Sequence, residues 1–441
     1  MFSNYGNTSL INMVSKLSSS EVLHFLIIVT VVLVLARILG ELCRRFKQPA
    51  IIGEILAGII LGPTILQHYL PNLFSDIFLS VPRAYGAFDG FANIGIILLM
   101  FVAGFEVDLT QIRRDGKHAL SISLTGIIFP FIVGFIAAWF FYQRIFSTGA
   151  TNQLITAMFF GTALSITALS VITKILMDLD ILKTKIGNLV LTSAMIDDFL
   201  GWILFSVIMQ MMHAGKDQGS ALSVIMVLAF AAFMVTIGRW GANKLFFVAQ
   251  KNLKIGRVIT LAICLCFTCA IITEYLGVRA VFGAFLMGVA IGDSKYFTDR
   301  HKLILHQFTV NIIAPLFFAS IGLRLNFVSN FNLEVVVVIL AIACIAKLIG
   351  AGIGSRLSGL NRNESIAVAF GMNARGSQEI VLGLLALQAK IIDEKVFEGL
   401  VVMTVATVLM SGPIMKRYFL KDLKTKGESE LTKAEIVDGL I

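Results

Sequence analysis

The stretch Gly371-Met-Asn-Ala-Arg-Gly-Ser-Gln-Glu379 lies in the middle of an apolar segment, residues 365–389, that is long enough to cross a bilayer as a helix. Glycine and polar residues at that depth interrupt a helix. Membrane proteins tolerate such a break only where the backbone is buried in protein or lines a cavity. Close helix packing would explain the glycines and the serine, but not asparagine, arginine, glutamine and glutamate together. We therefore expect a broken span here.

A second stretch of the same kind, Gly161-Thr-Ala-Leu-Ser-Ile-Thr-Ala-Leu-Ser170, lies in the apolar segment 152–176. These two segments are the fifth and the twelfth of the apolar segments along the chain. An offset of seven spans reverses the direction of every matched helix, so spans 1–6 and 8–13 would form an inverted-topology repeat around a linking seventh span. This plan is common among secondary transporters.

The composition fits a protein that lies mostly within a membrane. Of its 441 residues 57% are apolar or aromatic and 14% are charged, and the mean hydropathy is +0.88. The sequence predicts an all-α, multi-pass membrane protein with about 13 transmembrane helices, since the alternating pattern of a membrane β-barrel is absent. The predicted spans are 22–42, 50–68, 90–108, 118–142, 152–176, 186–212, 220–248, 256–276, 279–298, 304–325, 334–355, 365–389 and 396–416.

The basic residues set the expected orientation. Of the 36 lysines and arginines, 25 fall in one set of alternate loops together with the C-terminal tail, 8 on the opposite side and three inside spans. The positive-inside rule then places the N-terminal segment 1–21 outside and the tail 419–441 in the cytoplasm. The spans between them form a predicted transmembrane transporter domain at 22–418. We expect the cytoplasmic (inner) membrane as location. The net charge of +9 resides in loops and span ends, so no nucleic-acid partner is expected.

Two adjacent carboxylates, Asp197 and Asp198, lie near the middle of the sixth span. A charged side chain at the bilayer centre costs about 2.5–3.5 kcal/mol on insertion scales, which points to function rather than packing. Successive helical residues project about 100° apart, so one aspartate can face a water-filled cavity while the other finds a counter-charge. The candidate counter-charge is Lys347 in the eleventh span.

A buried carboxylate suits the exchange of an alkali cation for a proton, because each ligand excludes the other from the same oxygens. We expect Asp198 and Asp197 to bind a monovalent cation or a proton. The hydroxyl and carbonyl of Thr167 would complete the cation site, and Lys347 would supply a second protonation switch. The transported ions are Na⁺ or K⁺ and H⁺, and no other metal or cofactor is expected.

The remaining buried charges are expected to be structural. Arg375 and Glu379 are four residues apart, and so could form an ion pair that neutralises the ends of the broken helix. Glu54 in the second span and Glu106 near the end of the third are interpreted as residues of helix packing or gating.

Four motifs resemble those of the monovalent cation–proton antiporter superfamily. The resemblance is closer to the branch that includes bacterial Na⁺/H⁺ antiporters, spore-germination antiporters and glutathione-gated K⁺ efflux systems, and within it to exchangers without a C-terminal nucleotide-binding domain. The resemblance covers residues 22–418. The motifs are Gln48-Pro-Ala-Ile-Ile-Gly-Glu-Ile-Leu-Ala-Gly-Ile-Ile-Leu-Gly-Pro63, Phe101-Val-Ala-Gly-Phe-Glu-Val-Asp108, Phe282-Gly-Ala-Phe-Leu-Met-Gly288 and Pro315-Leu-Phe-Phe-Ala-Ser-Ile-Gly-Leu323.

The resemblance implies the sodium–proton antiporter fold, with a core of two three-helix bundles (residues 118–212 and 334–416) that contain crossing, unwound helices. It also implies a scaffold domain that forms a homodimer. The family's aspartate pair matches Asp197 and Asp198, of which the second carries the ion. Its unwound-helix threonine matches Thr167, and the lysine of its electrogenic members matches Lys347. Elevator-like exchange driven by the proton gradient follows as an expectation.

A Na⁺-coupled organic-solute symporter of similar architecture is the main alternative, and proton flux without an organic substrate would exclude it. A sensor or channel-like subunit, or a membrane enzyme, fits less well, because no signalling domain and no paired metal spacing of histidines is visible. The tail after Arg417 is too short for the nucleotide-binding domain of the glutathione-gated systems.

Overall fold

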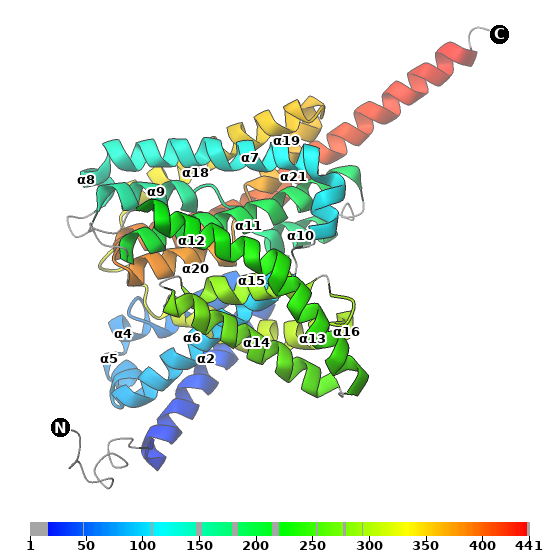
Figure 1. Ribbon diagram of the computed structural model, residues 1–441. Coiled ribbons are helices and arrows are strands. Elements are labelled where there is room, and N and C mark those ends of the chain that lie inside the picture. Colours follow the sequence, from blue (N-terminus) through cyan, green and yellow to red (C-terminus); the bar gives the residue numbers. More distant parts are fainter. Residues whose placement is uncertain are drawn as a thin grey trace. The chain divides into compact units, whose positions relative to one another are not determined.

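The computed structural model is helical wherever it has regular secondary structure among the residues that it describes (Figure 1). The described residues are 16–46, 48–105, 107, 109–146, 152–178, 184–213, 220–252, 255–276, 279–292 and 294–438. The chain divides into two compact units, one of residues 1–96 and 310–326 and the other of residues 97–309 and 327–441.

The first unit is built from helices near the N-terminus and one later helix. Its elements are α2 (Ser19–Arg45), α3 (Ala50–Leu61), α4 (Leu66–Tyr69), α5 (Pro71–Phe74), the π-helical turn η1 (Ser75–Leu79), most of α6 (Pro82–Phe105), most of the π-helical turn η3 (Thr309–Ile313) and α17 (Ala314–Gly322). Gly58 of α3 and Gly322 of α17 let these two helices touch along their backbones. A Cβ atom on Gly58 would lie 2.0 Å from the carbonyl oxygen of Ala319.

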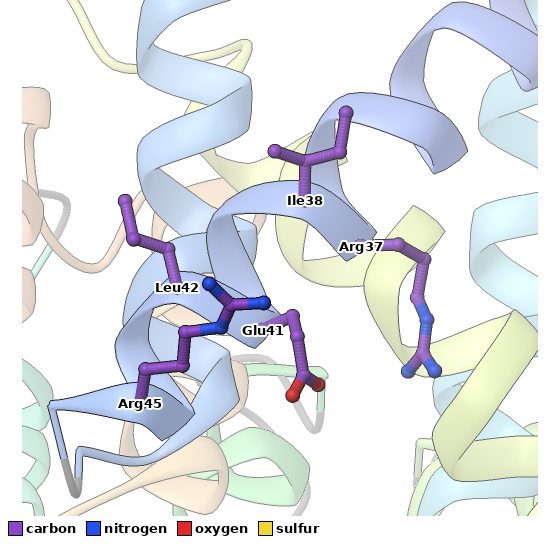
Figure 2. A pocket seen from close by; sticks show the side chains of 5 residues that line it. All are labelled: Arg37, Ile38, Glu41, Leu42 and Arg45. Atoms are coloured by element: carbon purple, nitrogen blue, oxygen red, sulfur yellow. The ribbon is translucent and has the colours of Figure 1, made fainter.

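An open hollow of about 490 Å³ lies on α2 of this unit, lined by Arg37, Ile38, Glu41, Leu42 and Arg45 (Figure 2). Arg37 donates a hydrogen bond to Asn311 at 3.2 Å. The hollow contains none of the aspartates that the sequence singles out, so it does not identify the transport site.

The second unit holds the predicted core spans. Its elements are α7 (Leu109–Phe140), α8 (Tyr142–Ile145), α9 (Gln153–Ala163), α10 (Leu169–Asp178), α11 (Lys185–His213), α12 (Ser220–Phe233), η2 (Met234–Gly238), α13 (Arg239–Asn252), α14 (Ile255–Tyr275), α15 (Ala280–Gly292), α16 (Asp299–Phe308), α18 (Leu333–Leu357), α19 (Arg362–Met372), α20 (Ser377–Gln388) and α21 (Glu394–Asp438).

Both predicted breaks are present. The first separates α9 from α10 at residues 164–168, and the second separates α19 from α20 at residues 373–376. The two breaks meet, because the backbone N–H of Ala168 donates to the carbonyl of Ala374 at 2.9 Å. Extended backbone inside an apolar unit must find such partners. Each break therefore satisfies part of the other's hydrogen bonding.

Helices α7 and α18, one from each predicted repeat, lie side by side (Figure 1). Glycines of α18 form the contact. A Cβ atom on Gly354 would lie 2.1 Å from the Thr125 hydroxyl, and one on Gly350 would lie 2.6 Å from the Thr125 carbonyl. Small residues at four-residue spacing let helices in a membrane approach closely. This approach brings Lys347, one turn before Gly350, against the backbone of α7.

Nine helices of the described residues are long and apolar enough to span a membrane. Three shorter apolar helices in the same residues are α9, α15 and most of α20. The multi-pass, all-α prediction is confirmed. The count of 13 spans stays a prediction, as do the domain boundaries. Helix α21 continues to Asp438, past the residue at which the cytoplasmic tail is predicted to begin.

Candidate functional site

Helix α11 carries both aspartates in its middle, and their side chains are buried, with exposed fractions of 0% for Asp197 and 1% for Asp198. Gly201, one turn further on, allows α11 to approach the first break, since a Cβ atom there would lie 2.6 Å from the Ile166 side chain. The aspartates therefore lie within a shell of protein, where polar groups need partners of their own.

Asp197 is held by three side chains from three different elements. Its Oδ2 lies 2.7 Å from Lys347 Nζ of α18 and accepts from the Thr167 hydroxyl of the first break at 2.8 Å. Its Oδ1 accepts from the Ser123 hydroxyl of α7 at 2.6 Å. This carboxylate thus lies in contact with an ammonium group and two hydroxyl groups.

Lys347 uses all three of its ammonium donors. Besides Asp197, it donates to the carbonyl of Gly126 at 2.9 Å and to the carbonyl of Ser165. An ammonium group has three donors and no acceptor, so its hydrogen-bonding capacity is filled. The lysine joins α7, the first break and α11 at one point.

Asp198 has different surroundings. Its Oδ2 accepts a hydrogen bond of 2.7 Å from the side-chain amide of Gln378, in the first turn of α20. Gln378 is itself 3% exposed. The two adjacent aspartates therefore face different partners, as expected from the 100° step between successive helical residues.

Arg375 connects the two breaks. Its guanidinium donates to the carbonyls of Ala163 and Leu164 at 2.9 and 2.5 Å and to Glu379 Oε1 at 2.7 Å. The last carbonyls of a helix have no partner within that helix and carry partial negative charge. Arg375 thus satisfies the carboxyl end of α9, and the expected ion pair with Glu379 is present.

The structure gathers four of the predicted residues at one point and separates others. Asp197, Lys347, Thr167 and, through α11, Asp198 come together where the breaks meet. The Thr167 hydroxyl also lies 2.7 Å from the carbonyl of Met372, so its single proton serves either this carbonyl or Asp197. Glu54 is buried in the first unit, at 4% exposure. Glu106 lies outside the described residues.

Sequence reasoning missed two residues of this site. Ser123 is one of three hydroxyl residues at alternate positions of an apolar span, with Ser121 and Thr125, and nothing in the sequence distinguishes it from the other two, since such residues in membrane helices often serve packing. Gln378 stands in the polar stretch of the second break, but nothing in the sequence shows that α20 begins at Ser377 and turns Gln378 toward α11.

The arrangement can hold a small cation or a proton on one carboxylate, beside a second carboxylate that is already compensated by a lysine. The chain also matches the model of the family described as "Sodium/hydrogen exchanger, transmembrane" over residues 17–421. The chain belongs to this family. It is therefore a transporter rather than an enzyme, as the sequence predicted.

Curated relatives in the family include the Na⁺/H⁺ antiporter NhaS4 of Synechocystis sp., 29% identical over 91% of this chain and 99% of the relative. The Na⁺/H⁺-K⁺ antiporter GerN of Bacillus cereus is 28% identical over 90% of this chain and 96% of its own length. Cation/H⁺ antiporter 18 of Arabidopsis thaliana is 29% identical over 91% of this chain, which spans about half (50%) of that longer protein.

Among solved structures, the sodium proton antiporter MjNhaP1 of Methanocaldococcus jannaschii superposes with a TM-score of 0.66 over 91% of this chain and 99% of that one, at 16% sequence identity. This likeness confirms the predicted fold class, the sodium–proton antiporter fold.

Proposed function

We propose that this family member exchanges Na⁺ or K⁺ for protons across the cytoplasmic membrane, with Asp198 alternately protonated and cation-loaded. The observation that carries the proposal is that the two aspartates have different hydrogen-bond and ion-pair partners. Asp197 is compensated by Lys347 and two hydroxyl groups, whereas Asp198 is contacted by the neutral amide of Gln378. A neutral donor yields to a cation or a proton more readily than an ion pair does, because no buried charge is left uncompensated.

The Asp197–Lys347 pair supports electrogenic exchange as part of the proposal. A cation near Asp198 repels the ammonium of Lys347, so loading could release a proton from this pair as well as from Asp198. More protons than cations would then move in each cycle. The Thr167 hydroxyl holds Asp197 beside the first break. Arg375, paired with Glu379, keeps the start of α20 against the end of α9.

Elevator-like alternating access, a homodimer and a cytoplasmic C-terminus complete the proposal. The shared order of a long helix, a broken span and a second long helix in α7–α11 and in α18–α21 fits the predicted inverted repeat and supports alternating access. The 25-to-8 distribution of basic residues supports the orientation, with the N-terminus outside. The relatives NhaS4 and GerN support Na⁺ and K⁺ as the candidate cations.

The test is cation-driven proton flux in proteoliposomes loaded with a pH-sensitive dye. Native protein, Asp198→Asn and Asp299→Asn receive Na⁺, K⁺ or Li⁺ in turn. The side chain of Asp299 is fully exposed (104%), so its variant is a matched control for the same chemical change. We expect native and control proteins to respond to at least one cation and Asp198→Asn to be silent. An inactive native protein would favour the organic-solute symporter instead.

A further inference from the structure

Gln378 has a buried side-chain amide of which only the NH₂ group forms a hydrogen bond among the described residues. Its Nε2 donates to Asp198 Oδ2 at 2.7 Å, while its Oε1 has no hydrogen-bond partner within the described part of the chain. The side chain is 3% exposed. An amide oxygen left unsatisfied in such surroundings costs about 1–3 kcal/mol, so its retention calls for a reason.

Holding the second break together does not supply that reason. Arg375 and Glu379 already fix the start of α20 to the end of α9 through an ion pair and two carbonyl contacts. A residue needed only to fill space at position 378 would not carry an amide whose oxygen lacks a partner, because an apolar side chain of similar length would avoid the penalty.

A cation on Asp198 would give the oxygen a partner. Hard cations are bound by carboxylate and amide oxygens, and an NH₂ group cannot serve as such a ligand. The terminal torsion of glutamine is soft and roughly two-fold, so a turn of about 180° exchanges the NH₂ group for the oxygen without moving the rest of the side chain.

We propose that Gln378 is a ligand of the transported cation. Its NH₂ group donates to Asp198 while that carboxylate carries no cation, and the amide turns over to present Oε1 once a cation is bound. This inference rests on the proposed exchange at Asp198 and adds a second protein ligand, from α20 in the other predicted repeat. Because α20 and α11 then both hold the cation, the distance between them helps to set which cation is preferred.

The experiment compares native protein with Gln378→Met, Gln378→Glu and Gln388→Met in proteoliposomes, measuring KM and maximal rate for Na⁺, K⁺ and Li⁺. Methionine keeps the length of the side chain and removes both polar ends. Glutamate keeps an oxygen at the ε position and, when ionised, loses the donor. Gln388 is exposed at the far end of α20, so Gln388→Met is the matched control.

The ligand role predicts that Gln378→Met raises KM for the preferred cation about tenfold or more, with the maximal rate within about twofold of native and a changed order among the three cations. Gln378→Glu should keep KM within about threefold of native, since an ε oxygen remains, and Gln388→Met should match native. If Gln378→Met elutes as an aggregate in size-exclusion chromatography, Gln378→Glu alone decides.

Two results would overturn the inference while leaving the proposed function intact, since native protein would still exchange and Asp198→Asn would still be silent. One is an unchanged KM and cation order in Gln378→Met. The other is an equal rise in KM for the methionine and glutamate variants, which would make Gln378 a donor that positions Asp198 and nothing more. Failure of native exchange itself would instead remove the proposed function.

Discussion

Lys347 Nζ lies 2.7 Å from Asp197 Oδ2, and both side chains have an exposed fraction of 0%. A buried ion pair is weak evidence for stability as such, but breaking it by removing one partner costs roughly 3–5 kcal/mol, since the other charge stays buried. The coupling free energy between the two residues is therefore measured only when the double variant is compared with both single variants.

A double-mutant cycle tests this coupling. We expect Lys347→Met to lower the melting temperature of the detergent-solubilised protein strongly, because Asp197 loses its counter-charge. Asp197→Asn combined with Lys347→Met should recover much of the loss, as two neutral groups need no ion pair. Additive losses in the double variant, measured by fluorescence-detected thermal unfolding, would show that the two residues do not depend on each other.

Arg375 should matter for stability more than for cation affinity. Arg375→Met leaves Glu379 and the carbonyls of Ala163 and Leu164 without their donor, so we expect a large loss of thermal stability, of the order of 3 kcal/mol or more. Arg375→Lys should recover only part, because a lysine ammonium cannot reproduce the planar fork of a guanidinium. Arg362→Met, at an exposed position of α19, is the control.

A normal KM in the surviving Arg375→Lys protein would agree with a structural role. A KM raised many-fold at unchanged thermal stability would contradict it and bring Arg375 into the cation site.

Gly354 should tolerate no side chain. In Gly354→Ala the new methyl group would lie 2.1 Å from the Thr125 hydroxyl and 2.7 Å from backbone atoms of Ser121 and Ile122. The backbone atoms cannot rotate away, so α7 and α18 must separate and Lys347 must shift relative to Gly126. We expect loss of both thermal stability and exchange rate. Gly86→Ala is the control, since nothing lies within 4 Å of the added methyl group and alanine favours a helix by about 1 kcal/mol. Native-like stability in Gly354→Ala would contradict the close helix contact.

Electrogenic exchange should be visible as current. We expect cation concentration jumps to produce currents from native proteoliposomes adsorbed to a solid-supported membrane, with charge movement reduced in Lys347→Met, because the lysine supplies the additional proton. Exchange that proceeds in the dye assay without any current, or at the same rate under different imposed voltages, would contradict this part of the account.

Much of this fold can be predicted from the sequence, because a bilayer permits few kinds of backbone structure. Apolar segments of span length and the polar breaks at Gly161–Ser170 and Gly371–Glu379 predict the broken helices, since few other sites tolerate such backbone. Lys347 is identifiable as a counter-charge because few basic residues fall inside a span.

The geometry of the site is less predictable. Which aspartate meets Lys347 depends on the rotation of α11 about its axis, and two adjacent residues in a sequence give no preference. The role of Gln378 depends on where α20 resumes after its break, and that of Ser123 on the glycine contact between α7 and α18. These are consequences of tertiary packing and not of local pattern.

The central claim, that one carboxylate exchanges a cation for a proton, is tested most directly by proton release on cation binding. Purified protein in weakly buffered detergent solution receives Na⁺, K⁺ or Li⁺ while a pH dye reports released protons, for native protein, Asp198→Asn and the control Asp299→Asn. We expect release from native and control proteins, saturating with the cation that drives exchange, and none from Asp198→Asn. Equal release from Asp198→Asn would contradict it, because the proton and the cation would then compete elsewhere.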